Sequence, residues 1–309
     1  MITKVRRVPV SRVVVALVAT ALTMGTTESA LSVAAAGASG PTKPLSTTGV
    51  AHWRMVGSYV ENSLTAGEGL ATVAGPGHGS HLIYRGLLSV PKNLAAEGWT
   101  HIGDPDAAGD VIIDAYQGPS SRRSKMFLVT RPSGSTVQYV HTLVAGELYN
   151  NSFDAIAPGS QWMVAGEWGT MTHLQVYPTP LLNNRTPPRG GALRLAGYIR
   201  LDHKVNDIQG CDFITKTALI CASDDDRRRL FTNEKPLLGV ELDHPLHGGS
   251  VRGHVVDLGS IPQRSKCSGT FEAEGVDYAT TTGILRVEVI QPASCVIHTT
   301  VYKYVRMSR

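Results

Sequence analysis

The chain alternates short apolar runs with Gly, Pro, Asn and Asp residues, and it almost lacks helical periodicity. Runs such as Gln161–Ala165, Ala218–Ala222 and Ile284–Val289 have the length and apolar character of buried strands bounded by turns. Only Pro91–Trp99 has the composition of a short helix. The pattern therefore predicts an all-β protein.

A short motif, a polar residue followed three positions later by aspartate, precedes four of these runs. Its copies are His101–Asp104, Asn151–Asp154, Gln209–Asp212 and Glu274–Asp277, and a weaker copy at Glu68 lacks the aspartate. Each copy leads through a turn into an apolar strand. Repeats of this kind are typical of propellers and related arrays. Because Asp side chains often bond backbone N–H groups in nearby turns, we expect the repeated aspartates to be structural.

Two more strands follow in the better copies, so each unit is expected to hold four antiparallel strands, as a propeller blade does. The last unit provides only three, and a strand at His52–Tyr59 is expected to complete it and close the ring. The repeats predict a β-propeller of five blades, or six if the N-terminal stretch hides another. A β-sandwich is the alternative. The further strands are Met126–Thr130, Val137–Leu143, His173–Tyr177, Leu193–Leu201, Pro236–Leu242, Val251–Leu258 and Thr299–Val305.

Two segments, GELYNNSFDAIAPGSQWMVAGEW (146–168) and EGVDYATTTGILRVEV (274–289), resemble blades of secreted β-propellers. The likeness is broadly to lactonase-like and esterase-like propellers, and it implies an architecture without a specific reaction. Lactonase-like propellers place Glu, Asn and Asp metal ligands at similar strand starts. Here His101 and Gln209 stand where ligands are expected.

Rotation between blades carries equivalent positions onto one ring, so the repeat predicts which polar residues meet at one mouth of the central channel. We call this set the predicted rim, and it is acidic with no evident cation beside it. The starts of the inner strands contribute Glu68, His101, Asn151, Gln209 and Glu274. The ends of the second strands contribute Gln117, Glu167, Trp168, Asp224 and Asp225.

Three kinds of chemistry suit the predicted rim. Carboxylate and amide oxygens are ligands that Ca²⁺ prefers, which makes Glu68, Asn151 and Glu274 candidate ligands. His101 and Glu274 are candidates for moving a proton in catalysis. Trp168 is expected to pack in the core, or to stack on a sugar at the rim.

The first 36 residues have the layout of a signal peptide: a basic start, an apolar run at Val13–Met24 and small residues up to Ala36. Cleavage is expected near Ala36, or else near Ala30, and a retained membrane anchor is the alternative. Residues 37–50 then form a flexible lead-in, and 51–309 a single propeller domain without a membrane span. An even number of cysteines in an exported chain predicts disulfides. We favour Cys211–Cys221 and Cys267–Cys295, because each pair flanks an expected strand connection.

Charge and composition narrow the function only by exclusion. The net charge of +4 falls to +1 without residues 1–36, too little to predict nucleic-acid binding. We expect a secreted monomer that binds a small molecule, carbohydrate or protein at the acidic mouth. The alternatives are a divalent-metal-dependent hydrolase of a lactone, ester or phosphoester, and a glycosidase with paired carboxylates such as Glu68 and Glu274. Whether the chain is an enzyme stays open.

Overall fold

The structure is a computed structural model that describes residues 52–307 except Pro76 and His78. The predicted signal peptide (1–36) and lead-in (37–50) lie outside the described residues. Among the helices of the described part, none is long and apolar enough to cross a membrane.

The described chain is all-β, as predicted, with one short α-helix, α1 (Lys92–Ala96), and two 3₁₀ turns, η2 (Leu87–Ser89) and η3 (Ala293–Cys295). Its strands are β1 (Trp53–Asn62), β2 (Gly69–Ala74), β3 (Ser80–Arg85), β4 (His101–Ile102), β5 (Asp106–Ala108), β6 (Val111–Gln117), β7 (Ser124–Thr130), β8 (Thr136–Thr142), β9 (Phe153–Ile156), β10 (Trp162–Gly166), β11 (Met171–Pro178), β12 (Gly191–Ala192), β13 (Gly197–Val205), β14 (Ile208–Thr215), β15 (Ala218–Ser223), β16 (Pro236–Leu242), β17 (Val251–Ser260), β18 (Glu272–Ala279), β19 (Ile284–Ile290) and β20 (His298–Arg306).

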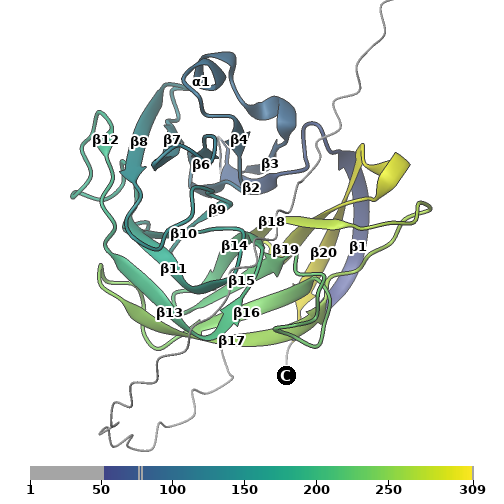
Figure 1. Cartoon of the computed structure of the whole chain (residues 1–309). Helices are drawn as coiled ribbons and strands as arrows, with labels where there is room; N and C mark the ends of the chain where they lie inside the picture. Colours follow the sequence, from purple (N-terminus) through teal and green to yellow (C-terminus); the bar gives the residue numbers. More distant parts are fainter. Residues whose placement is uncertain (1–51, 76, 78, 308–309) are drawn as a thin grey trace, which may run out of the picture. The chain divides into compact units, whose positions relative to one another are not determined.

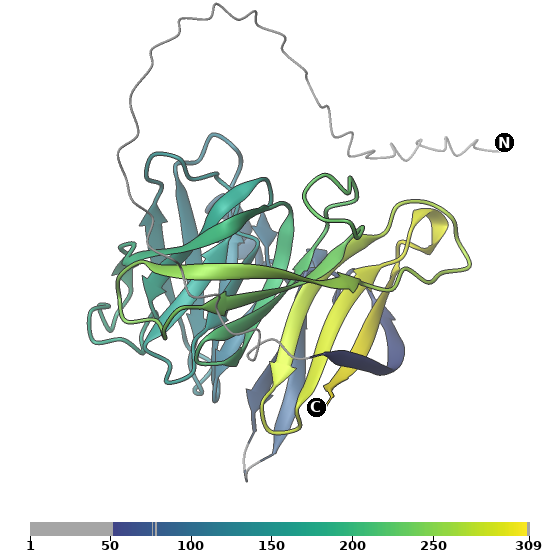
Figure 2. The same ribbon diagram turned by 90° about the horizontal axis from the view of Figure 1, so that it is seen from below.

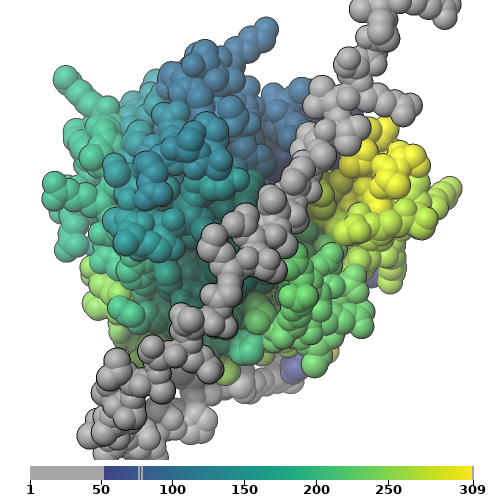
Figure 3. Space-filling model, in the orientation of Figure 1, coloured from purple at the N-terminus to yellow at the C-terminus, as the bar shows by residue number. Residues whose placement is uncertain are grey.

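Five short strands lie at the centre and contact one another in a closed ring, in the order β2, β5, β9, β14, β18 and back to β2. From β5, β9, β14 and β18 the chain runs outward through successive antiparallel strands (Figure 1). Such radial repetition around an axis is the arrangement of a β-propeller. In the space-filling view, the blue, green and yellow parts of the described chain occupy successive sectors of the molecule (Figure 3).

The N-terminal strand completes the last sheet, as predicted. Strand β1 pairs antiparallel with β20, so this sheet has the order β1-β20-β19-β18 and combines the two ends of the described chain. Figure 2 shows the purple β1 beside the yellow strands of this sheet.

The other sheets depart from a uniform set of four-stranded units. Strands β9, β10, β11 and β13 join β14–β17 in one eight-stranded sheet through a parallel pair, β13 with β17. The unit of β6–β8 gains β12, again in parallel. Among the described strands, β3 pairs with β2 alone, because the chain then turns into η2 and α1, whose Leu94 is buried. The sequence pattern did not predict these two parallel pairings or the two-stranded unit.

The core lies between neighbouring sheets, where apolar faces meet. Phe153, Val164 and Leu219 belong to one buried cluster, and Ile220, Val287 and Tyr302 to the next. Because alternate residues of a strand face opposite sides, Leu219 and Ile220 pack into different clusters. Removal of this apolar surface from water stabilises the radial arrangement and fixes the inner strands.

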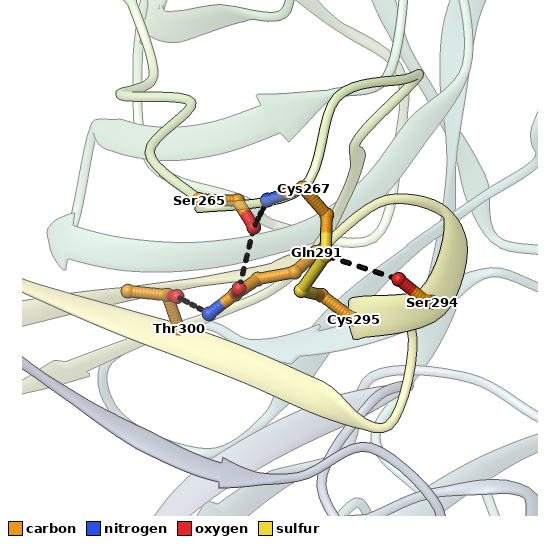
Figure 4. Close-up of a disulfide and its surroundings, with 6 residues drawn as sticks. All are labelled: Ser265, Cys267, Gln291, Ser294, Cys295 and Thr300. Carbon is orange, nitrogen blue, oxygen red and sulfur yellow. Dashed lines mark hydrogen bonds between the residues drawn. A yellow bond between two sulfur atoms is a disulfide. The ribbon is translucent and has the colours of Figure 1, made fainter.

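Both predicted disulfides are confirmed. Cys211 and Cys221 are directly opposite each other in the β14–β15 pair. Cys267 and Cys295 join the segment before β18 to the β19–β20 connection (Figure 4). There Ser265 Oγ donates to Gln291 Oε1 at 2.8 Å, and Gln291 Nε2 donates to Thr300 Oγ1 at 3.0 Å, which fixes the connection beside the disulfide.

Candidate functional site

One part of the predicted rim comes together around His101 at the start of β4. His101 Nε2 lies 3.3 Å from Glu68 Oε2, and its ring meets the Trp168 ring edge-on with 5.1 Å between centroids. Gln117 is opposite His101 in the β4–β6 pair, and Asn151 N donates to Gln117 Oε1 at 3.0 Å. These five residues, far apart in sequence, therefore lie close together.

Burial keeps this part of the rim largely uncharged. It lowers the pKa of His101 to about 4, so the imidazole is neutral at pH 7. Burial, helped by the charge of Glu272, raises the pKa of Glu68 to about 8. The Glu68–His101 contact at neutral pH is thus between two neutral groups. A histidine with a pKa near 4 is a poor general base at pH 7.

Two further rim positions, Glu274 and Gln209, lie on β18 and β14. Glu274 is buried, and desolvation followed by the charge of Glu68 raises its pKa well above the usual range. Gln209 sits at an irregularity in the β14–β15 pairing, between Ile208 and Gly210.

The expectation that no cation lies beside the rim carboxylates is wrong. Lys125 Nζ pairs with Glu167 Oε1, and Gln175 Nε2 donates to the same oxygen at 2.9 Å. Lys235 Nζ lies 2.6 Å from Asp224 Oδ1. Both lysines are buried. Lys125 and Lys235 each directly precede an apolar run of the sequence. A lysine in such a position is the only sequence feature that indicates a buried cation beside a carboxylate.

Asp225 and Glu167 accept hydrogen bonds from the protein's own backbone. Asp225 is buried and accepts a bond from Arg227 N at 3.2 Å, the geometry of a local turn. Glu167 also accepts from Leu148 N at 2.9 Å. Glu167 Oε1 and Asp225 Oδ1 thus accept bonds from protein donors.

Asp104 closes the central axis just beyond the rim. Its Oδ1 accepts from Leu70 N of β2, and its Oδ2 from Val276 N of β18, each at 3.0 Å. Its backbone pairs with Phe153 of β9. The inner strands approach so closely here that a Cβ on Gly69, Gly210 or Gly275 would collide with Asp104. Asp104 therefore lies between the rim positions Glu68 and Glu274 and the opposite ends of β2 and β18.

The repeated aspartates are structural, as expected, but they act between strands and not within local turns. Asp212 Oδ2 accepts from Tyr278 N of the neighbouring inner strand at 2.6 Å. Asp277 accepts from Thr72 N at 2.6 Å and from Thr72 Oγ1 at 2.9 Å. Asp154 is the exception, since neither of its buried oxygens has a close hydrogen-bond donor among the described residues. Inner strands lack backbone partners on the channel side, and these carboxylates provide them.

A cavity of about 640 Å³ opens at the far ends of the inner strands, beyond Asp104. Its lining includes Thr72, Asp106, Asp212, Asp277, Tyr278 and Thr280. Asp106 accepts from Ile156 N at 2.5 Å, and burial raises its pKa to about 7. Burial likewise raises the pKa of Asp212, well above the ordinary value. The repeat predicts a site at the other end of these strands, and no pattern in the sequence indicates this cavity.

The residues described here offer little for a metal ion. They contain no group of three or more His, Cys, Asp or Glu side chains placed to hold one. Of the candidate calcium ligands, Asn151 has a buried Oδ1 without a partner, whereas Glu68 has a pKa raised to about 8. Calcium takes six to eight oxygen ligands from carboxylates, carbonyl groups and waters. Calcium binding by Glu68, Asn151 and Glu274 stays a prediction.

Comparison with known proteins gives structural likenesses only. No family model matches the chain, and no curated protein matches its sequence. Among solved structures, a gluconolactonase from Xanthomonas campestris aligns at 12% identity and TM-score 0.33, over 75% of this chain and 64% of that one. A DUF4623 family protein from Bacteroides eggerthii aligns at 8% identity and TM-score 0.37, over 84% of this chain and 78% of that one. The arabinanase Arb43A from Bacillus subtilis aligns at 9% identity and TM-score 0.38, over 84% of this chain and 95% of that one. The chain thus spans less than two thirds of the gluconolactonase.

Proposed function

We propose that this protein is an exported five-bladed β-propeller that binds a small polyhydroxylated ligand, of the carbohydrate class, in the cavity beyond Asp104. Each of the five inner strands heads one blade in this proposal. The two disulfides support an oxidising compartment, where such bonds persist.

The observation that carries the proposal is the cavity itself. Its volume of about 640 Å³ lies within the ordinary range for small-molecule sites. Asp106, Asp212 and Asp277 line it together with Thr72 and Thr280. The three carboxyl groups each accept bonds from protein N–H groups, and because a carboxylate has about four acceptor sites, each keeps capacity for a ligand hydroxyl. Sugar hydroxyls are donors and acceptors at once, so they suit a wall of carboxyl oxygens and hydroxyls.

Blocking the cavity tests the proposal. Thr280 is exposed at the cavity edge, so Thr280→Trp fills the opening without disturbing the core. Thr232→Trp, at an exposed position away from the cavity, is the matched control. Calorimetric titration with a panel of neutral oligosaccharides should give binding to wild type and to the control, and none to Thr280→Trp. Equal binding by all three proteins would reject the cavity as the site.

A second candidate, acid-catalysed glycoside hydrolysis, rests on Asp106. A carboxyl group with a pKa of about 7 can donate a proton at neutral pH, as the general acid of a glycosidase does. Against this, both oxygens of Asp106 accept backbone N–H groups, from Ala107 and Ile156. An assay of the wild-type protein for release of reducing ends separates the two functions: a hydrolase should release them from the oligosaccharides that it binds, whereas a binding protein should leave these oligosaccharides intact.

The predicted rim is a less suitable ligand site than the cavity. Of its carboxylates, Glu167 and Asp224 are paired with lysines, and the contact of Glu68 with His101 is between neutral groups at pH 7. A metal-dependent hydrolase at the rim stays a prediction, and we derive no step through a metal.

A further inference from the structure

A second, smaller cavity lies in the connection between β11 and β13. Its volume is about 400 Å³. Pro187, Leu193 and Leu195 form apolar walls, and Arg185 and Arg194 also line it. None of these residues belongs to the larger cavity, so this groove is a separate feature of the surface.

The groove is held in shape by contacts with the neighbouring sheet. Tyr139 Oη donates to Pro187 O at 2.6 Å, and Arg131 Nη2 donates to Pro188 O at 2.7 Å. Strand β12, in the same connection, pairs in parallel with β8. The connection therefore has a defined conformation, which lowers the entropic cost of binding there.

The charge of this connection is unbalanced. Residues 178–200 contain four arginines, Arg185, Arg189, Arg194 and Arg200, and no Asp or Glu. Within the described part of the chain, none of the four forms an ion pair with a carboxylate. The Arg185 guanidinium instead lies over the Trp162 ring, 5.1 Å from its centroid. No acidic side chain lines the groove.

We infer that this groove binds an organic oxyanion, a carboxylate or a phosphate ester carried on an apolar body. Two guanidinium groups present planar forks of donors that match carboxylate and phosphate oxygens. The proline and leucine walls take the apolar body, which loses water on binding. This site is independent of the proposed saccharide cavity, and either can fail without the other.

Phenyl phosphate and benzoate are suitable probes, with benzyl alcohol as the neutral analogue. Trp162 lies under Arg185, so quenching of tryptophan fluorescence reports binding, and Trp162→Phe should remove most of that signal. Arg185→Gln and Arg194→Gln should each weaken binding of the anions about tenfold or more, the usual loss for one charge-assisted bond. Arg189→Gln is the matched control, because Arg189 lies in the same connection but does not line the groove.

The two anions distinguish the kinds of oxyanion. Tighter binding of phenyl phosphate assigns the site to phosphate esters, and tighter binding of benzoate assigns it to carboxylates. Wild-type binding of either anion with loss in both groove variants supports the site. Three results overturn it: no binding of either anion to wild type, equal binding by the groove variants and Arg189→Gln, or equal binding of benzyl alcohol. Saccharide titration of the same variants should be unchanged.

Discussion

At the scale of single residues, buried carboxyl groups dominate the electrostatics of the inner strands. Burial raises the pKa of Glu68, Asp106 and Asp224, to about 8, 7 and 7 respectively. When folding raises the pKa of an acid, the unfolded chain ionises first as the pH increases. The folded state therefore loses relative stability between the ordinary pKa and the raised one. These groups make the protein less stable at pH 8 than at pH 5.

Glu68→Gln tests this sign. The substitution removes the titration and keeps the shape of the protonated acid. We expect little change in the free energy of unfolding at pH 5, and a gain on the order of 2 kcal/mol at pH 8.5. Urea unfolding at both pH values measures it, with Asp110→Asn, an exposed carboxylate, as control. A loss of stability at pH 8.5 would contradict the assignment of Glu68 as a destabilised charge.

Lys125 tests the opposite case, a buried charge that has a partner. Lys125→Met leaves Glu167 buried without its cation, which should cost about 3–5 kcal/mol of unfolding free energy. The double variant Lys125→Met with Glu167→Gln should recover most of that loss, because no unpaired charge remains. Chemical denaturation of both variants gives the answer, and equal stability of the single and double variants would show that the pair does not interact.

At the scale of elements, Asp104 joins inner strands that have no backbone partners across the axis. Asp104→Ala leaves the N–H groups of Leu70 and Val276 unpaired in the interior, and the expected loss is about 2–4 kcal/mol. Asp110→Ala, in the same unit but exposed, should change stability by less than about 0.5 kcal/mol. Similar denaturation midpoints for the two variants would mean that Asp104 does not hold the strands together.

The elements were largely predictable because apolar runs between turn residues depend on local sequence. The run Pro236–Leu242 is observed unchanged as β16, and Ala218–Ala222 differs from β15 by one residue. The strand expected at Leu193–Leu201 instead lies at Gly197–Val205, because Leu193 belongs to the groove of the β11–β13 connection. The parallel pairing of β13 with β17 joins strands of different units, and no local pattern encodes such a contact.

The candidate site was harder to predict, because it too depends on contacts between units that no local sequence pattern encodes. The repeat placed Glu68, His101 and Trp168 together, because rotation between units relates their positions. It gave no information on Lys125 and Lys235, whose partners are set by packing. Nor did it indicate that the Asp104 carboxylate lies on the axis, which moves the accessible cavity to the other end of the inner strands.

At the scale of the whole molecule, β1 joins the beginning of the described chain to its end. A chain that starts at Ser63 lacks β1 and leaves the edge of β20 without hydrogen-bond partners. We expect its melting temperature to fall by more than about 5 °C relative to a chain that starts at residue 51. Differential scanning calorimetry measures this, and equal melting temperatures would show that closure by β1 does not stabilise the molecule.

The central claim is that a polyhydroxylated ligand enters the cavity beyond Asp104 and does not bind at the predicted rim. Hydrogen–deuterium exchange with and without a saturating saccharide from the titration panel tests it most directly. Slower exchange is predicted in segments 72–75, 106–109, 156–160 and 277–281, which contain residues of the cavity lining. No change is predicted in segments 66–69 and 147–151 beside the rim. Protection confined to the rim segments, with the cavity segments unchanged, would contradict it.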